Sequence, residues 1–171
     1  MPAVGMLRPL ATQSRADLAM VYDIHQPNAE MTAIRHGVSV ASAASDVFAS
    51  FEVDAVLVET TTDTHADFIE MSVAAGKPVL CEKPIDLDLN RVNRCAQKIS
   101  GTSVPVQIGF NRRYDPGHSS AREAVLAGEI GELHQVIITS RDPEVPPRAY
   151  LEAAGGLFRD CLLYTSDAAD E

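Results

Sequence analysis

A regular alternation of short apolar segments and longer amphipathic ones most constrains what this chain can fold into. Residues 54–58 are apolar on both faces, as a strand inside a parallel sheet must be. The segment that follows has a helical pattern, and Gly76 and Pro78 stop it. Strands that alternate with helices form right-handed βαβ units. The chain is therefore predicted to be an α/β protein with a doubly wound, parallel, Rossmann-like sheet.

The same alternation runs through the first two thirds of the sequence, and it predicts five strands and three helices. Strands are expected over 17–22, 38–40, 54–58, 78–80 and 104–110, and helices over 30–36, 64–75 and 88–99. Thr64 stands three residues before Asp67, which is the spacing of a capping box. The third helix is expected to place one apolar face on the core, made of Leu89, Val92, Cys95, Ala96 and Ile99.

The pattern changes after Pro116, and a domain boundary is predicted near residues 114–117. Residues 119–127 look helical, and residues 133–139 alternate between apolar and polar, as in a strand with one solvated face. This second part is interpreted as the start of an α+β domain.

Composition excludes several classes of function. The formal net charge is −10, which argues against nucleic acid as a partner because phosphate contacts need clustered Lys and Arg. No apolar run approaches the roughly 20 residues that span a bilayer. The three cysteines form no CxxC pair, which favours reduced thiols in a cytoplasmic protein, and no His, Cys or acidic spacing suggests a metal.

Lys83 is the residue most suggestive of chemistry. It lies in the segment Leu80-Cys81-Glu82-Lys83-Pro84-Ile85, directly after a predicted strand. Open α/β sheets place their ligands at the carboxyl ends of the strands. A lysine held there, with its proton affinity lowered by burial, is a candidate proton shuttle, whereas the alternative is a surface lysine in a βα turn.

Four separated segments resemble one known family. They are VLVETTTDTHADFIEMSVAAGKPVLCEKPIDLDL (56–89), QIGFNRRYDP (107–116), ITSRDP (138–143) and GGLFRD (155–160). In order and spacing they resemble the glucose–fructose oxidoreductase and inositol dehydrogenase family (Gfo/Idh/MocA), and within it the inositol 2-dehydrogenase-like members, over residues 18–160.

The resemblance implies an NAD-dependent oxidoreductase that oxidises a secondary hydroxyl of a cyclic polyol or sugar, and that is a homo-oligomer in its full-length form. Lys83 matches the family's lysine, whose expected role is to hydrogen-bond the reacting hydroxyl and relay its proton. Asp160 matches the second catalytic polar group. Pro84 is associated in this motif with a cis peptide bond.

Cofactor contacts are expected from residues at several strand ends. Asp23 closes a strand, where an acid can accept both ribose hydroxyls and favour NAD over NADP; the alternative is a helix cap. Glu82 could contact the nicotinamide ribose or only orient its turn, and Arg112 could hold a cofactor or substrate group or pair with Asp115. The remaining residues assigned to the cofactor site are Thr60, Thr61, where the family commonly has proline, His65, whose role is expected to be more structural than catalytic, and Lys83 itself.

Both ends depart from the family pattern. No GxGxxG motif is present, and Tyr164 stands where the family has a histidine four residues after Asp160. The expected organisation is a truncated NAD-binding domain over 1–115 that lacks its first strand and Gly-rich loop, the start of a substrate and oligomerisation domain over 116–161, and a non-native tail over 162–171. The alternative is a non-catalytic α/β interaction or regulatory module of the same fold.

Overall fold

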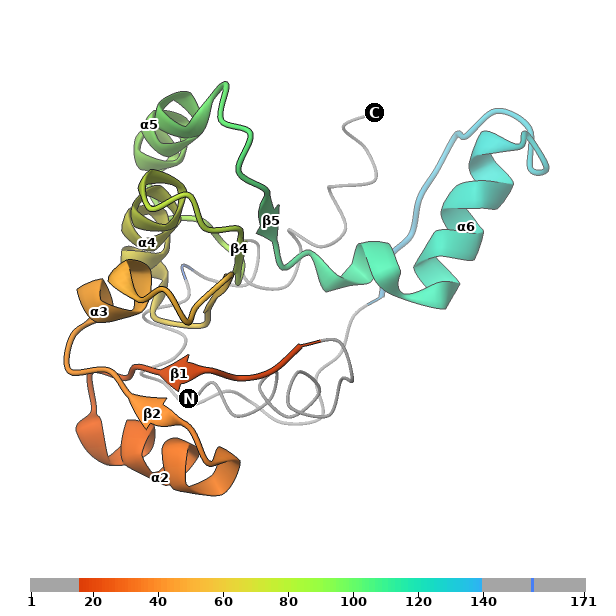
Figure 1. The fold of residues 1–171 in the computed structure, drawn as a ribbon. Coiled ribbons are helices and arrows are strands. Elements are labelled where there is room, and N and C mark those ends of the chain that lie inside the picture. Colours follow the sequence, from red (N-terminus) through yellow and green to blue (C-terminus); the bar gives the residue numbers. More distant parts are fainter. Residues whose placement is uncertain (1–15, 140–154, 156–171) are drawn as a thin grey trace.

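The computed structural model describes residues 16–139 and 155 of the 171-residue chain. Within them, short parallel strands alternate with helices, and a last helix stands apart from the sheets (Figure 1). The elements, in chain order, are β1 (Met20–Val21), α2 (Gln26–His36), β2 (Ser39–Val40), α3 (Ala44–Ala49), β3 (Val56–Val58), α4 (Thr62–Ala74), β4 (Val79–Cys81), α5 (Leu89–Ile99), β5 (Val106–Ile108), the 3-10 helix η1 (Asn111–Tyr114) and α6 (Pro116–Leu126).

The strands form two parallel sheets, one of β1 and β2 and one in the order β3-β4-β5. A doubly wound sheet has the strand order 3-2-1-4-5-6. The two sheets occupy the 3-2 and 4-5-6 positions of that order, and no strand of the described residues fills the position between them. The predicted parallel, Rossmann-like α/β fold is confirmed.

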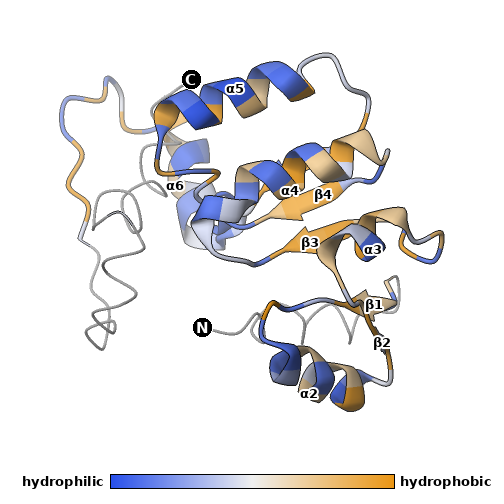
Figure 2. Cartoon of the chain, turned by 90° about the vertical axis from the view of Figure 1, so that its left-hand side faces the viewer, coloured by the Kyte–Doolittle hydropathy of each residue, from blue (hydrophilic) through white to orange (hydrophobic). Residues whose placement is uncertain are grey.

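The larger core lies between the three-stranded sheet and the helices α4 and α5. Alternate residues of the strands, such as Val58 and Cys81, point at Ala66 and Ile69 of α4 and at Cys95 of α5. Met20 of β1 packs against the same core, which joins the two sheets into one structure. Figure 2 shows β3 and β4 as hydrophobic and much of α5 as hydrophilic, as expected for strands covered by an amphipathic helix.

A smaller core holds α2 against β1 and β2. Val21 packs with Ala29 and Ala33, whose small side chains allow the helix to approach the strands closely. The helix ends at Gly37, which has a φ of 68° and donates its N–H to the carbonyl of Ala33. Glycine suits this position because the helix end needs a left-handed residue.

The predicted apolar face of α5 is only partly correct. Cys95 is buried and Val92 and Ile99 are half-buried, but Leu89 and Ala96 are exposed, Leu89 by 69%. Leu89 is the first residue of the helix, directly after its N-cap Asp88, whose carboxylate accepts from the N–H of Asn90. Part of the contact with α4 is made instead by a charged side chain, Arg91.

Two other local predictions are wrong. Thr64 does not cap α4: the N-cap is Thr61, and the Thr64 hydroxyl donates to the Thr60 hydroxyl and the Thr61 carbonyl. Residues 133–139 form no strand, and all of them are exposed. A strand needs a neighbour for its backbone groups, and no other described segment pairs with these residues.

Three features of residues 16–139 concern membranes, metals and cysteines. No helix there combines the length and apolar content needed to cross a membrane. No group of three His, Cys, Asp or Glu side chains is close enough to hold a metal ion. Cys81 and Cys95 are buried free thiols, and burial, with a smaller contribution from the Glu82 charge, raises the pKa of Cys81 to about 12. A thiol with that pKa is a poor nucleophile at neutral pH.

Candidate cofactor and active site

The carboxyl ends of β3, β4 and β5 place three residues side by side. The last paired residues are Val58, Cys81 and Ile108, so Glu59, Glu82 and Gly109 follow one another across the sheet edge. The Glu82 N–H donates to the Val58 carbonyl at 2.9 Å, and the Gly109 N–H donates to the Cys81 carbonyl at 2.8 Å. Figure 2 shows β3 and β4 pointing to the same side of the molecule, where the turn from β1 into α2 also lies.

The Lys83 turn lies directly at this edge. The Lys83–Pro84 peptide bond is cis, as the family resemblance implied. Lys83 is half-buried, and its backbone N–H donates to Oε2 of Glu82 at 3.2 Å. Lys83 is therefore not a fully solvated surface lysine, and its backbone is tied to the neighbouring carboxylate.

His65 connects the Lys83 turn to the turn that follows β3. The ring is buried, with Nδ1 2.7 Å from the carbonyl oxygen of Pro84 and Nε2 3.1 Å from that of Thr60. Both neighbours are acceptors, so a neutral imidazole donates to one of them at a time. His65 thus contacts main chain in two turns at the site, which agrees with a structural role.

Glu82 is positioned by the absence of a side chain at Gly109. A Cβ at Gly109 would lie 3.0 Å from Oε1 of Glu82, 3.2 Å from its Cδ and 3.3 Å from its Oε2. Only glycine leaves this space free. The carboxylate therefore lies over β5, within the row of residues at the sheet edge.

Glu59 belongs to the site although the sequence reasoning missed it. Its Oε1 is buried and has no hydrogen-bond partner among the described residues. Burial, and secondly the charge of Glu82, raise the pKa of Glu59 to about 7. The signal was available in the sequence: a carboxylate directly follows the apolar strand residues Val56-Leu57-Val58.

Thr60 and Thr61 form the exposed turn between β3 and α4. The Thr60 hydroxyl accepts from the Thr64 hydroxyl at 2.6 Å, and the Thr61 carbonyl accepts from the N–H of Thr64 at 2.9 Å. Although Thr61 replaces a proline that is common in the family, the turn is ordered by these bonds and by the contact of His65 with Thr60.

Asp23 lies in the turn after β1, and it does not occupy the N-cap position of α2, which is His25. Its Oδ1 accepts from the His25 N–H at 2.8 Å, and its Oδ2 accepts from the side-chain amide of Asn28 at 3.3 Å. Each carboxylate oxygen retains capacity for a further donor. This is a suitable arrangement for two ribose hydroxyls.

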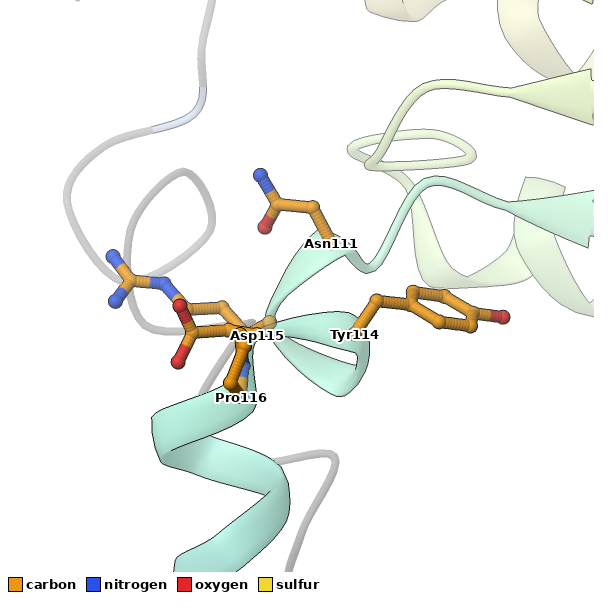
Figure 3. A pocket seen from close by; sticks show the side chains of 5 residues that line it. Asn111, Tyr114, Asp115 and Pro116 are labelled. Carbon is orange, nitrogen blue, oxygen red and sulfur yellow. The ribbon is translucent and has the colours of Figure 1, made fainter.

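A hollow of about 430 Å³ lies beyond the end of β5, and its lining includes Arg112. Figure 3 shows Tyr114 turned away from Asn111 and Asp115, and the Tyr114 hydroxyl accepts from the Gln107 side chain at 2.9 Å. The remaining lining residues are Asn111, Asp115 and Pro116.

Asp115 in this lining is held by α6. Its Oδ1 accepts from the N–H and the ring Nδ1 of His118, and the ring contact is the larger cause of a lowered pKa of Asp115. The other predicted catalytic residue, Asp160, lies outside the described residues.

An open parallel sheet with polar side chains gathered beyond the carboxyl ends of its strands defines a nucleotide-binding α/β domain. Residues 5–110 match the family model described as "Oxidoreductase family, NAD-binding Rossmann fold" (Gfo/Idh/MocA). The chain belongs to this family, and the expectation of NAD as the cofactor of its fold is confirmed.

Individual relatives agree with this assignment. An inositol 2-dehydrogenase of Rhizobium meliloti is 42% identical over 168 residues, which are 97% of this chain and 51% of that protein. A crystal structure of a myo-inositol dehydrogenase from Corynebacterium glutamicum has a TM-score of 0.84 and 36% identity, covering 95% of this chain and 49% of that one.

A further solved structure carries ligands. The scyllo-inositol dehydrogenase from Lactobacillus casei with bound NAD(H) and scyllo-inositol has a TM-score of 0.72 and 28% identity, over 77% of this chain and 40% of that one. This chain spans about half the length of the first two relatives named here.

Proposed function

We propose that this chain forms the cofactor-binding part of an NAD-dependent oxidoreductase that oxidises a secondary hydroxyl of a cyclic polyol or sugar, as inositol 2-dehydrogenases do. The observation that supports this most is the Lys83 turn: a half-buried lysine at the carboxyl end of β4, joined by a cis bond to Pro84 and bonded through its N–H to Glu82. In this proposal residues 1–115 are the NAD-binding domain and residues 116–161 begin the substrate domain.

NAD, when bound, supplies the acceptor for the hydride. Asp23 would hold the adenosine ribose through its two carboxylate oxygens. Each oxygen already accepts one hydrogen bond, from the His25 N–H or the Asn28 side chain. Thr60, Thr61 and Glu82 would line the crevice at the ends of β3 and β4, and His65 would keep those two turns at a fixed distance. The negative charge of Asp23 disfavours a 2′-phosphate, so NAD is expected over NADP.

Lys83 would hydrogen-bond the reacting hydroxyl and accept its proton as the carbon–hydrogen bond breaks. Arg112 and Asn111, which line the hollow beyond β5, would hold neighbouring hydroxyls of the substrate, and Asp160 would be the second catalytic group. The free thiols of Cys81 and Cys95 support a cytoplasmic location. Homo-oligomer formation stays a prediction from the resemblance.

The test uses the purified chain, calorimetric titration with NAD, and absorbance of reduced nicotinamide with myo-inositol as substrate. Binding tighter than about millimolar, roughly 4 kcal/mol, is expected. Turnover is measured on a version of the chain extended to the length of its relatives, in which Lys83→Ala should abolish turnover with little loss of NAD affinity, since its role is proton transfer. Lys98→Ala, at an exposed lysine of α5, is the matched control and should retain turnover.

The outcomes separate the two candidate functions. Turnover retained by Lys83→Ala would remove the lysine from the mechanism. NAD binding without turnover by the extended version would favour the non-catalytic α/β module.

A further inference from the structure

Two carboxyl groups stand next to each other at the proposed cofactor edge. Glu59 and Glu82 each follow the last paired residue of neighbouring parallel strands, so their side chains leave the same face of the sheet. Neighbouring strands are about 4.8 Å apart, which is close enough for two carboxylates to repel each other strongly.

We infer that Glu59 is a positioning residue that acts through Glu82: on the acid side of neutral pH Glu59 is held as the neutral acid, so that the pair carries one negative charge and Glu82 stays in place over Gly109 beside Lys83. The consequence for cofactor binding rests on the function proposed above. The inference itself concerns only the two carboxyl groups and the turn they support.

The surroundings decide which carboxyl group carries the proton. Oε2 of Glu82 accepts from the Lys83 N–H, and that bond favours the ionised form. Oε1 of Glu59 is buried and has no partner among the residues described, so ionisation there would leave a charge without a donor. Glu59 is therefore the member of the pair that keeps its proton.

One charged group of the described residues, and it is negative, acts on the pKa of Glu59. Glu82, on the β4 turn, is the charge that acts on Glu59. His65 of α4 directs both ring nitrogens at the main chain of Thr60 and Pro84, and β5 contributes Gly109, which has no side chain. Lys83, the cation of the same turn, donates its backbone N–H to Oε2 of Glu82.

The inference predicts a direction of pH dependence. The pKa of Glu59 is about 7 in the folded chain against an ordinary value of 4.5, so the folded chain binds this proton more tightly than the unfolded one. Stability from this site is therefore present at low pH and falls as the pH rises from 4.5 through about 7. Above that range a second negative charge repels Glu82 and loosens the Lys83 turn.

The first test follows thermal unfolding of the full chain between about pH 5 and pH 8.5, the range over which such a group changes charge. The unaltered chain should lose melting temperature across this range more steeply than Glu59→Gln, which mimics the neutral acid. Glu52→Gln removes an exposed glutamate and should follow the unaltered chain. Parallel profiles for Glu59→Gln and the unaltered chain would overturn the inference.

The second test begins with the unaltered chain and does not depend on the Glu59→Gln variant. With ¹³C-labelled glutamate, NMR titration of the unaltered chain should show one carboxyl group titrating near pH 7, and Glu82→Gln should move that titration to lower pH. No carboxyl titrating near neutral pH, or one that ignores Glu82→Gln, would contradict the inference.

Cofactor affinity separates this inference from the proposed function. NAD should bind the unaltered chain about tenfold more weakly at high than at low pH, since one pKa unit of coupling is a tenfold change. The affinity of Glu59→Gln should stay constant with pH. If NAD does not bind at all, the proposed function fails, while the stability and NMR profiles still decide the role of Glu59. NAD binding without pH dependence would overturn the link between them.

Discussion

At the scale of single residues, a substitution at Gly109 should alter the position of the Glu82 carboxylate with little effect on the stability of the fold. Gly109→Ala would place a Cβ 3.0 Å from the Glu82 carboxylate, which must then move. Because the displaced atoms are the end of a flexible side chain, we expect the free energy of unfolding to change by less than about 1 kcal/mol. NAD affinity, measured by calorimetric titration, should fall.

Gly76→Ala is the matched control for this prediction. Gly76 has a φ of 72° and open space around it, so alanine there adds backbone strain of about 1–2 kcal/mol without touching the site. It should lower the melting temperature and leave NAD affinity unchanged. If both variants behaved alike, Gly109 would have no particular role in placing Glu82.

Some residues of the candidate site could be proposed from the sequence, whereas others depend on the three-dimensional structure. Lys83 and Asp23 could be proposed from the sequence because each carries a charge two residues after the end of a strand. Glu59 was missed because its significance comes from strand register, which places it beside Glu82, and from burial of Oε1. The link that His65 makes between two carbonyl groups also depends on how α4 lies against two turns.

At the scale of elements, a network of ion pairs joins α5 to α4. Arg91 of α5 contacts Asp67 at 2.5 Å and Glu70 at 2.6 Å, and Lys98 contacts Glu70 at 2.6 Å. The Glu70 side chain is only 12% exposed. Burial alone would raise the pKa of Glu70, but the hydrogen bonds from Lys98 and Arg91 outweigh it and the pKa is lowered.

Glu70→Gln should therefore destabilise the chain at neutral pH by about 1–2 kcal/mol, measured by urea unfolding, because it leaves the Arg91 charge partly unpaired. The lowered pKa means that this stabilisation is present above the ordinary value of 4.5 and is lost as the pH falls through the folded value. The difference from the unaltered chain should accordingly shrink in acid.

A suitable control is Glu30→Gln, at an exposed position of α2, which should change the free energy of unfolding by less than about 0.5 kcal/mol. A Glu70→Gln effect that did not diminish in acid would mean that packing, and not charge, joins the two helices.

The elements themselves were predictable where periodicity is long and where glycine or proline marks an end. All five strands and three helices expected before Pro116 are present; four of the strands are shorter than predicted, and β4 has the predicted length shifted by one residue. The six-residue helix α3 was missed because it is too short to show a period. The strand expected over 133–139 failed because alternation predicts a solvated face but cannot supply a partner strand.

For the molecule as a whole, strand–helix alternation determined the fold because right-handed crossovers leave few ways to arrange parallel strands. The alternation could not determine how extensively the last helix, α6, packs against the other elements. Helix α6 packs mainly on η1 and buries no residue, whereas α4 buries His65, Ala66, Ile69 and Ser72.

This difference leads to a prediction about hydrogen exchange in the full chain. Opening α6 exposes almost no apolar surface, while opening α4 exposes the larger core, so amides of Pro116–Leu126 should exchange at least about tenfold faster than those of α4. Helix α5, which buries only Cys95 but is linked to α4 by Arg91, should be intermediate and should approach α6 in the Glu70→Gln variant. Mass spectrometry of peptides from the three helices gives the comparison directly. Equal protection of α6 and α4 would contradict a boundary near residues 114–117, because it would require the last helix to open only together with the core.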